Sequence, residues 1–595
     1  MAHKLAASVM VYAFGALATA SALAQANLTP QQIDHMIRAE WKEHEIVPSA
    51  PVDDAGYLRR IYIDITGSIP PAQAAEDFIS DHAPDKRQKA VEALLDSPGY
   101  TNQWTNYWDG VLMSTARSQV IDRGAFRLWL RTQFDRNTPW NRFVYDLITA
   151  RGQNSLGGTY QETMMAGIQT AQLNPGETGS INGATNWVLK YQGKPEDLSG
   201  TASKVFLGVQ IQCAQCHDHK TEKWKQADFR SFTANFINTR SKQIDVGMVK
   251  GGIRRVDLED VNRPFQPRGK KAVSIADYAA ASPAALDGTD FSGVANRRQS
   301  LASWMVADDN PWFANAIVNR MWGHFMGRAF VEPIDDFRPS NPPVMPELMN
   351  ELSADFKASG YDLKHLIKTI CLTQAYQVGS SAAAKPGMDN TYWAKYRLKP
   401  MAPDQLLDSL VQATNVKPVL EQTVGANLDQ IRLQLERQFQ FLFDVDEEFE
   451  QKDFEGTIPQ ALMLLNGGLV NSSVRPIPGT ALAEVQGMQA SDAEKITSLY
   501  LRTFSRNPTE AELKRWVTFV NAPRDTVNGG RIAVAGRQGA AAMGKGGKKN
   551  APNTGFNPLA RASNQLQRAE STPKDQAYED LFWALLNSSE FLFNH

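Results

Sequence analysis

The chain has 595 residues, with 62 lysines and arginines against 64 aspartates and glutamates, 42% apolar residues and three cysteines. This composition excludes a small disulfide-stabilised protein, a collagen, a fully disordered chain and a membrane protein with many spans. The net charge of −2 gives no electrostatic reason to expect nucleic acid or an anionic membrane as a partner.

Residues 1–24 are predicted to form a signal peptide. A weakly basic start at His3 and Lys4 precedes a stretch of small and apolar residues, and Ala22-Leu23-Ala24 is typical of a cleavage site. An uncleaved N-terminal anchor is the alternative interpretation. We therefore expect an exported protein, periplasmic or secreted, with no transmembrane span once the signal peptide has been removed.

Helical patterns recur along most of the mature chain. Thr29, Pro30 and Gln32 predict a capped helix start, and Thr509 with Glu512 predicts another. Apolar residues at helical spacing follow both starts and recur between them. These patterns predict a mainly α-helical fold.

Strand-like alternation is scarce, and residues 57–65 and 252–256 are its best short candidates. Two segments lack helical patterning. Residues 239–297 are punctuated by glycine, proline and alanine, and residues 522–575 have too few apolar groups to form a packed core. We therefore expect two helical domains joined by an irregular connection. The predicted parts after the signal peptide are an N-terminal domain at 25–238, the connection at 239–297 and a C-terminal domain at 298–595 with a flexible insertion at 522–575.

One motif points to a specific chemistry. Cys213 and Cys216 are two residues apart, and His217 follows the second cysteine directly. This is the attachment pattern of haem c, in which one turn presents both thiols to the porphyrin edge and the histidine binds iron. The motif therefore predicts haem c, held by Cys213, Cys216 and His217.

Two other readings of the motif stay open. A structural zinc site could use both cysteines with His217, His219 or both, although the two histidines are closer in sequence than in most zinc modules. A disulfide or thiol redox pair between Cys213 and Cys216 is the other alternative. The zinc interpretation would make the protein a zinc-stabilised binding or scaffold protein, or an accessory of a metal-dependent hydrolase.

The sixth iron ligand is not fixed by the motif. His324, which lies among aromatic residues in the second half, is the leading candidate, and His219 is better suited to a supporting or substrate-binding role. A distal histidine or methionine would favour electron transfer, whereas an open position would permit haem-based oxidation. The weaker candidates are Met248, Met321, Met326 and His365.

The wider sequence resembles the planctomycete cytochrome c-like paired domains of unknown function 1549 and 1553, also written PSCyt and PSD. The resemblance covers nearly the whole mature chain. In the first half it is carried by LRRIYIDITGSIPP at 58–71, LLDSPGYTNQWTNYWDG at 94–110, FRLWLRTQFDRNTPWNRFVYDLI at 126–148 and FLGVQIQCAQCHDHKTEKW at 206–224. In the second half it is carried by NPWFANAIVNRMWGHFMGRAFVEPIDDF at 310–337, QALMLLNG at 460–467 and LYLRTFSRNPTEAEL at 499–513.

This resemblance implies an exported, largely helical protein with no settled activity, often encoded beside a secreted sulfatase-like protein, which is one expected partner. The haem motif makes a periplasmic redox protein the other. Members of the family frequently carry an additional N-terminal cytochrome domain, which this chain lacks. We therefore expect a single haem in this polypeptide and electron transfer or haem-based redox chemistry as its function.

Overall fold

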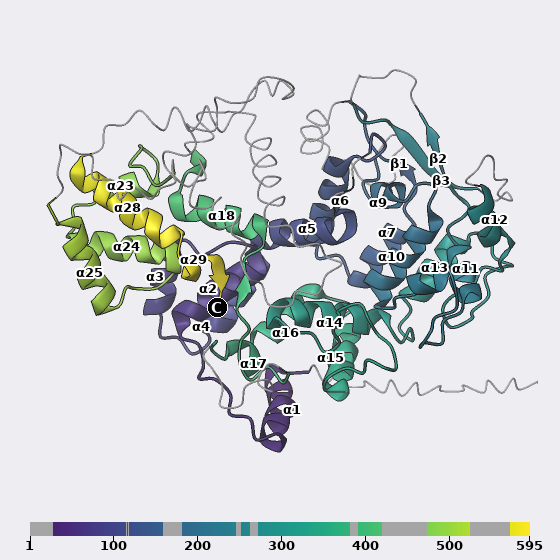
Figure 1. The fold of residues 1–595 in the computed structure, drawn as a ribbon, viewed down its shortest axis with the longest axis horizontal. Coiled ribbons are helices and arrows are strands. Elements are labelled where there is room, and N and C mark those ends of the chain that lie inside the picture. The colour runs from purple at the N-terminus through teal and green to yellow at the C-terminus, as the bar shows by residue number, and fades with distance from the viewer. Residues whose placement is uncertain are drawn as a thin grey trace, which may run out of the picture.

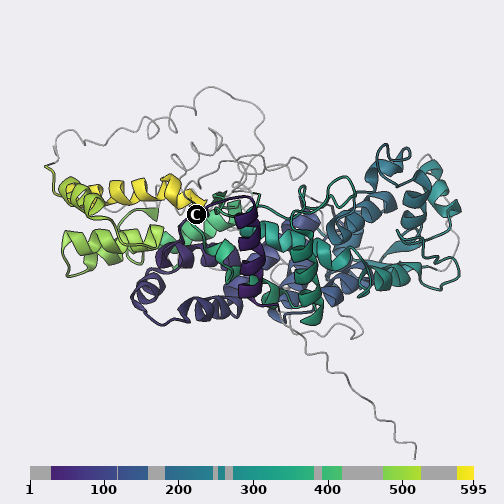
Figure 2. The same ribbon diagram turned by 90° about the horizontal axis from the view of Figure 1, so that it is seen from below.

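The computed structural model describes residues 28–114, 116, 118–158, 181–244, 252–261, 272–380, 391–418, 473–523 and 572–595. Over these ranges the chain is mainly helical, as predicted, with a few short strands. In both views the C-terminal helices lie at one end of the molecule and the region around the cysteine motif lies towards the other (Figures 1 and 2). No helix among the described residues is long and apolar enough to cross a membrane.

The first half begins with the predicted capped helix, in which the Thr29 side chain and Gln32 complete a capping box. The segment 57–65, predicted to be a strand, is instead part of a helix, because both of its faces are buried and its apolar residues pack in every direction. The helices up to the motif are α1 (Pro30–Glu43), α2 (Asp54–Thr66), α3 (Ala72–Ser80), α4 (Lys86–Leu95), α5 (Pro98–Met113), α6 (Arg123–Asp135), α7 (Trp140–Ile148), α9 (Thr185–Lys190) and α10 (Pro195–Leu207).

The chain then passes through the 3-10 helix η1 (Gln212–Gln215) into helix α11 (Gln226–Thr233). A small antiparallel sheet follows, with strand order β1-β3-β2, in which β1 comes from the first half. Residues 239–297, expected to be irregular, therefore supply two paired strands and a helix where they are described. These elements are β1 (Gly152–Gln153), β2 (Thr239–Gln243), β3 (Val256–Asp260) and α12 (Ala272–Ala280).

The second half starts with a bundle around α14, whose residues are buried on nearly every side. It ends in a group of helices that closes with strand β5 against β4. The elements are α13 (Arg297–Met305), α14 (Phe313–Met326), α15 (Pro346–Ala358), α16 (Leu363–Cys371), α17 (Gln374–Gln377), β4 (Lys399–Pro400), α18 (Pro403–Thr414), α23 (Ala481–Gly487), α24 (Asp492–Phe504), α25 (Glu510–Val520), α28 (Pro573–Leu586), α29 (Ser589–Leu592) and β5 (Phe593–Asn594).

The two halves share their apolar cores. The larger core contains residues from Leu28, just before α1, to Tyr396, together with Leu501. It therefore draws on both halves of the chain. The smaller core joins the C-terminal helices to Ile63 and Ile69 of the first half. Burying apolar surface from both halves in the same cores couples their folding.

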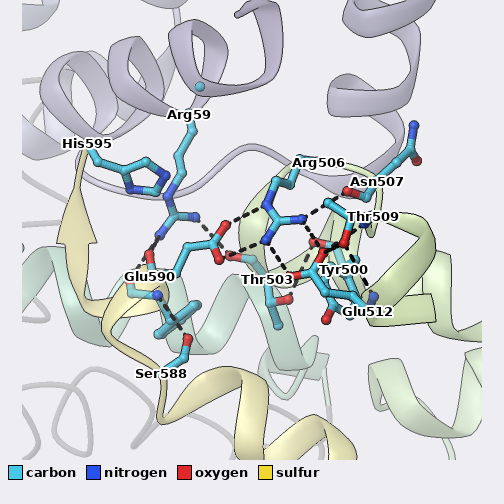
Figure 3. Close-up of polar contacts among 12 residues, drawn as sticks. Arg59, Tyr500, Thr503, Arg506, Asn507, Thr509, Glu512, Ser588, Glu590 and His595 are labelled. Carbon is cyan, nitrogen blue, oxygen red and sulfur yellow. Dashed lines mark hydrogen bonds and ion pairs between the residues drawn. The ribbon is translucent and has the colours of Figure 1, made fainter. Parts of the chain in front are cut away.

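Two arginines complete this junction, one of them, Arg59, fully buried. Arg59 of α2 donates to the backbone oxygens of Thr503 and Phe591 at 2.8 and 2.9 Å. Beside it, Arg506 pairs with the carboxylates of Glu512 and Glu590 (Figure 3). The Arg59 bonds attach the end of the chain to a helix near its beginning, and the Arg506 pairs link Glu590 to α25.

Candidate haem attachment site

The cysteine motif follows a helix end that the second half of the chain fixes in place. Gly208 caps α10 in the left-handed conformation, with φ of 67°, and its N–H donates to the Lys204 oxygen. A Cβ atom at this position would lie 2.1 Å from Cδ2 of Phe337, whose N–H donates to the Gly208 oxygen at 2.8 Å. Both the backbone conformation and the close ring therefore require glycine.

Residues 212–219, here called the cysteine turn, begin as the 3-10 helix. Ala214 is fully buried, whereas Cys213 and Cys216 on either side of it are exposed free thiols. The Gln226 side chain donates to the backbone oxygens of Gln215 and Cys216 at 3.1 and 3.0 Å. A buried alanine and a glutamine clamp thus hold the turn with both sulfurs directed away from the core.

The hydrogen bonds of His217 prepare it to bind a metal. Its Nδ1 lies 2.8 Å from the Asp218 backbone oxygen, and the imidazole itself is exposed. A carbonyl oxygen only accepts, so this contact places the ring proton on Nδ1 and the lone pair on Nε2. A metal-ligating histidine characteristically donates its other ring N–H to such an oxygen.

His219 has the opposite arrangement. Its Nδ1 accepts the backbone N–H groups of Thr221 and Glu222, at 3.3 and 3.0 Å, so the neutral ring carries its proton on Nε2. Neither ring nitrogen then offers a lone pair to a metal. His219 organises the loop after the turn and does not match the role of a second metal ligand.

The second half of the chain also contributes polar groups to this region. Ser340 donates to Glu222 at 2.6 Å, and Arg338 pairs with Asp336 at 3.1 Å. The pKa of the Asp336 carboxyl is raised, chiefly by burial. Arg338 and His219 act to lower this pKa, and Glu222 acts to raise it. Both halves of the chain therefore contribute to the region next to the cysteine turn.

His324, the predicted sixth ligand, lies elsewhere. Its ring packs between Trp104 and Tyr107, with centroids 5.2 Å from each, and Nε2 is 3.4 Å from the Asp64 backbone oxygen. Burial lowers its pKa to about 4, and the Lys399 ammonium acts in the same direction. These contacts of His324 are all made with residues outside the cysteine turn, and its role as the sixth ligand stays a prediction.

The weaker candidates are also occupied or lie elsewhere. Met321 and Met326 are buried in α14, and His365 pairs with the Asp355 carboxylate at 2.7 Å. Met248 lies outside the described residues. Within the described part of the chain, no group of three or more histidine, cysteine, aspartate or glutamate residues is arranged to hold a metal ion.

The sequence analysis missed a buried polar cluster, here called the Asp64 centre. Asp64 Oδ1 accepts from Lys399 and Asn594, both at 2.8 Å, while Oδ2 accepts from the hydroxyls of Tyr376 and Tyr396 at 2.8 and 3.2 Å. The segment RRIYIDITG held the only signal, two arginines and an aspartate inside an otherwise apolar stretch. Its assignment to a strand concealed that signal.

Two family models match the chain, one over each half. PSCyt2, a protein of unknown function (DUF1549), matches residues 32–241, and PSD1, a protein of unknown function (DUF1553), matches residues 297–520. The chain belongs to the family with this domain pair. No curated protein and no solved structure matches it. The cysteine turn lies in the PSCyt2 domain, and the segment around Asp336, which contacts Gly208 and Glu222 on either side of the turn, lies in the PSD1 domain.

The earlier resemblance is thus confirmed for the family and for its two domains. One of the segments that carried it, QALMLLNG at 460–467, lies outside the described residues, as do the predicted signal peptide at 1–24 and most of the insertion predicted at 522–575.

Proposed function

We propose that this protein is an exported single-haem c-type protein that transfers electrons to a periplasmic partner or carries out haem-based redox chemistry. The observation that supports this proposal most strongly is the state of the three motif residues. Cys213 and Cys216 are exposed free thiols on one short turn, and His217 keeps the lone pair on Nε2. Each residue thus offers the atom that covalent haem attachment requires.

The residues present fit a haem better than a tetrahedral zinc ion. A zinc site with two cysteines and two histidines needs a lone pair on both imidazoles. His219 gives its Nδ1 lone pair to two backbone N–H groups, so it does not supply the second imidazole of such a site. Covalent attachment needs only two thiols and one imidazole, all of which the turn leaves available.

In this role Cys213 and Cys216 would hold the porphyrin by thioether links, and His217 would bind the iron through Nε2. A haem bound here supplies one-electron exchange. The Asp218 oxygen keeps the His217 ring oriented, and the buried Ala214 keeps the turn attached to the protein. Both cysteines are exposed, so the attachment residues are accessible to a second protein.

The test is expression with and without a cytochrome c maturation system, followed by haem staining after denaturing electrophoresis. We expect covalent stain only with the maturation system, and its loss in Cys213→Ala/Cys216→Ala. The buried third cysteine provides the control, since Cys371→Ala should keep the stain. A colourless folded protein containing stoichiometric zinc would contradict the proposal.

The two histidines provide a second, matched comparison. His217→Ala should shift the Soret band of the attached haem, because it removes the iron ligand. His219→Ala should leave the band in place, because that ring does not reach the iron. Equal effects of the two substitutions would contradict the assignment.

Export is tested separately by recovering mature protein that begins after Ala24 from the periplasmic fraction.

A further inference from the structure

A continuous row of aromatic rings runs through the shared core. It begins in α9 and α10, passes through α7 and α5, and ends in α14 and α17. Neighbouring ring centroids along the row are 4.6 to 6.2 Å apart. In order, the members of the row are Trp187, Phe206, Trp140, Trp108, Tyr107, Trp104, Phe325 and Tyr376.

The two ends of the row lie at chemically distinct places. The first end is Trp187 in α9, and its neighbour Phe206 is in the last turn of α10, the helix that leads into the cysteine turn. The turn also packs on this helix, because a Cβ atom at Gly200 would lie 2.5 Å from Cγ of Gln212. At the other end, the Tyr376 hydroxyl donates to Asp64 Oδ2 at 2.8 Å. The row therefore leads from the base of the cysteine turn to the Asp64 centre.

The tryptophans of the row have an unusual property. Trp104, Trp108, Trp140 and Trp187 are all buried, and none of their indole N–H groups has a hydrogen-bond partner among the described residues. Buried indole N–H groups normally find an acceptor, and leaving one unpaired costs free energy. An indole that loses an electron here has no acceptor for its proton, so the oxidised ring keeps the proton and can recover an electron from its neighbour.

Tyr376 differs from these tryptophans in having an acceptor for its proton. When it loses an electron, its hydroxyl proton can move to Asp64 Oδ2, leaving a neutral tyrosyl radical and a protonated carboxyl group. The electron passes along the row to the oxidant, so charge and protons balance. Lys399 and Asn594, both bonded to Oδ1, keep the carboxylate in position for this transfer.

We propose that this row is an electron-transfer route between the cysteine turn and the Tyr376–Asp64 pair. The oxidant is a metal-centred one-electron oxidant of high potential held at the turn. The inference deepens the proposed function, and rests on it only for the place where the oxidant is held. Its test uses a synthetic oxidant at that place, so it can succeed or fail whether or not the protein binds haem.

The experiment attaches a ruthenium polypyridyl complex to Cys213 in full-length Cys216→Ser protein; the buried Cys371 stays unlabelled. Flash excitation with an external electron acceptor generates the ruthenium(III) oxidant at the turn. We expect transient tryptophan oxidation, followed by a tyrosyl radical visible by electron paramagnetic resonance after rapid freezing. Tyr376→Phe should abolish that tyrosyl signal.

Two matched tryptophans decide between a route and ordinary core packing. Trp108→Phe interrupts the row and should cause loss of the tyrosyl signal. Trp322→Phe removes an equally buried indole with an unpaired N–H that packs instead on Phe330 and Trp393, and should preserve the signal. Thermal unfolding confirms that both variants fold. An unchanged signal in Trp108→Phe, or no aromatic radical in the labelled parent, would overturn the proposal.

Discussion

The cysteine turn and the Asp64 centre both gather groups that can bind metals or exchange protons, but they use them in opposite ways. In the Asp64 centre both carboxylate oxygens are bonded by donors from the second half of the chain. In the cysteine turn the backbone is held by Gln226 and Ala214, while two thiols and the Nε2 atom of His217 are left available. A saturated polar cluster stabilises a fold, whereas ligand atoms left available on a fixed backbone indicate a binding site.

The largest effect on stability is expected at Asp64. Asp64→Asn leaves the Lys399 ammonium buried without its counter-charge, and we expect a loss of about 3–5 kcal/mol in the free energy of unfolding. Urea unfolding measures this change. Asp85→Asn is the control, because its exposed pair with Lys89 should not affect the unfolding midpoint. Similar midpoints for the two variants would show that the Asp64 centre does not stabilise the fold.

The end of the chain provides the next largest effect. Asn594 is buried beside Asp64, and Asn594→Ala removes its 2.8 Å hydrogen bond to Oδ1. We expect a loss of about 1–3 kcal/mol in the free energy of unfolding, because a buried acceptor loses a donor. Asn102→Ala, which removes a solvent-exposed hydrogen bond from Arg131 and is measured in the same urea titration, should change it by less than about 0.5 kcal/mol. If Asn594→Ala loses no more stability than Asn102→Ala, the hydrogen bond from Asn594 to Asp64 does not stabilise the fold.

A smaller, pH-dependent effect is expected at His365. Its hydrogen bond to Asp355 raises the histidine pKa, burial opposes this, and the charges of Asp355 and Asp362 raise it further while Lys368 lowers it. The folded pKa lies above the unfolded value of about 6.5. The stabilisation is therefore complete below that pH and is lost as the pH rises through the folded pKa.

The measurement is the urea midpoint of the parent protein and of His365→Gln across this pH range. The stability difference between them should be largest in acid and shrink as the pH rises. A difference that grows with pH would contradict the assigned direction.

The smallest stability effect is expected at the cysteine turn. Cys213→Ala/Cys216→Ala changes two exposed side chains, and in protein made without a maturation system the free energy of unfolding should change by less than about 0.5 kcal/mol. Comparing urea midpoints of the variant and the parent measures this. A large loss would mean that the thiols support the fold, and would remove the contrast with the Asp64 centre.

The sequence predicted what depends on local signals. Both capping boxes, at Thr29 with Gln32 and at Thr509 with Glu512, are confirmed, because capping involves residues only three positions apart. The helical class is confirmed for the same reason. The spacing of the cysteine motif likewise placed Cys213 and Cys216 on one short turn.

What depends on distant contacts was not predictable. The strand assigned at 57–65 is part of α2, because a helix buried on all sides loses the one-sided pattern that identifies it. The Asp64 centre needs residues more than 300 positions apart, which no local pattern joins. The different tautomers of His217 and His219 follow from backbone contacts, so spacing alone treated the two residues as similar.

The central claim is that haem is bonded covalently to Cys213 and Cys216. Its most direct test is mass spectrometry of the tryptic peptide at 205–220, which contains both cysteines and both histidines of the turn. In protein made with a cytochrome c maturation system, the account predicts that this peptide carries the added mass of one haem. An unmodified peptide, recovered from folded protein in a host that attaches haem to a control cytochrome, would contradict it.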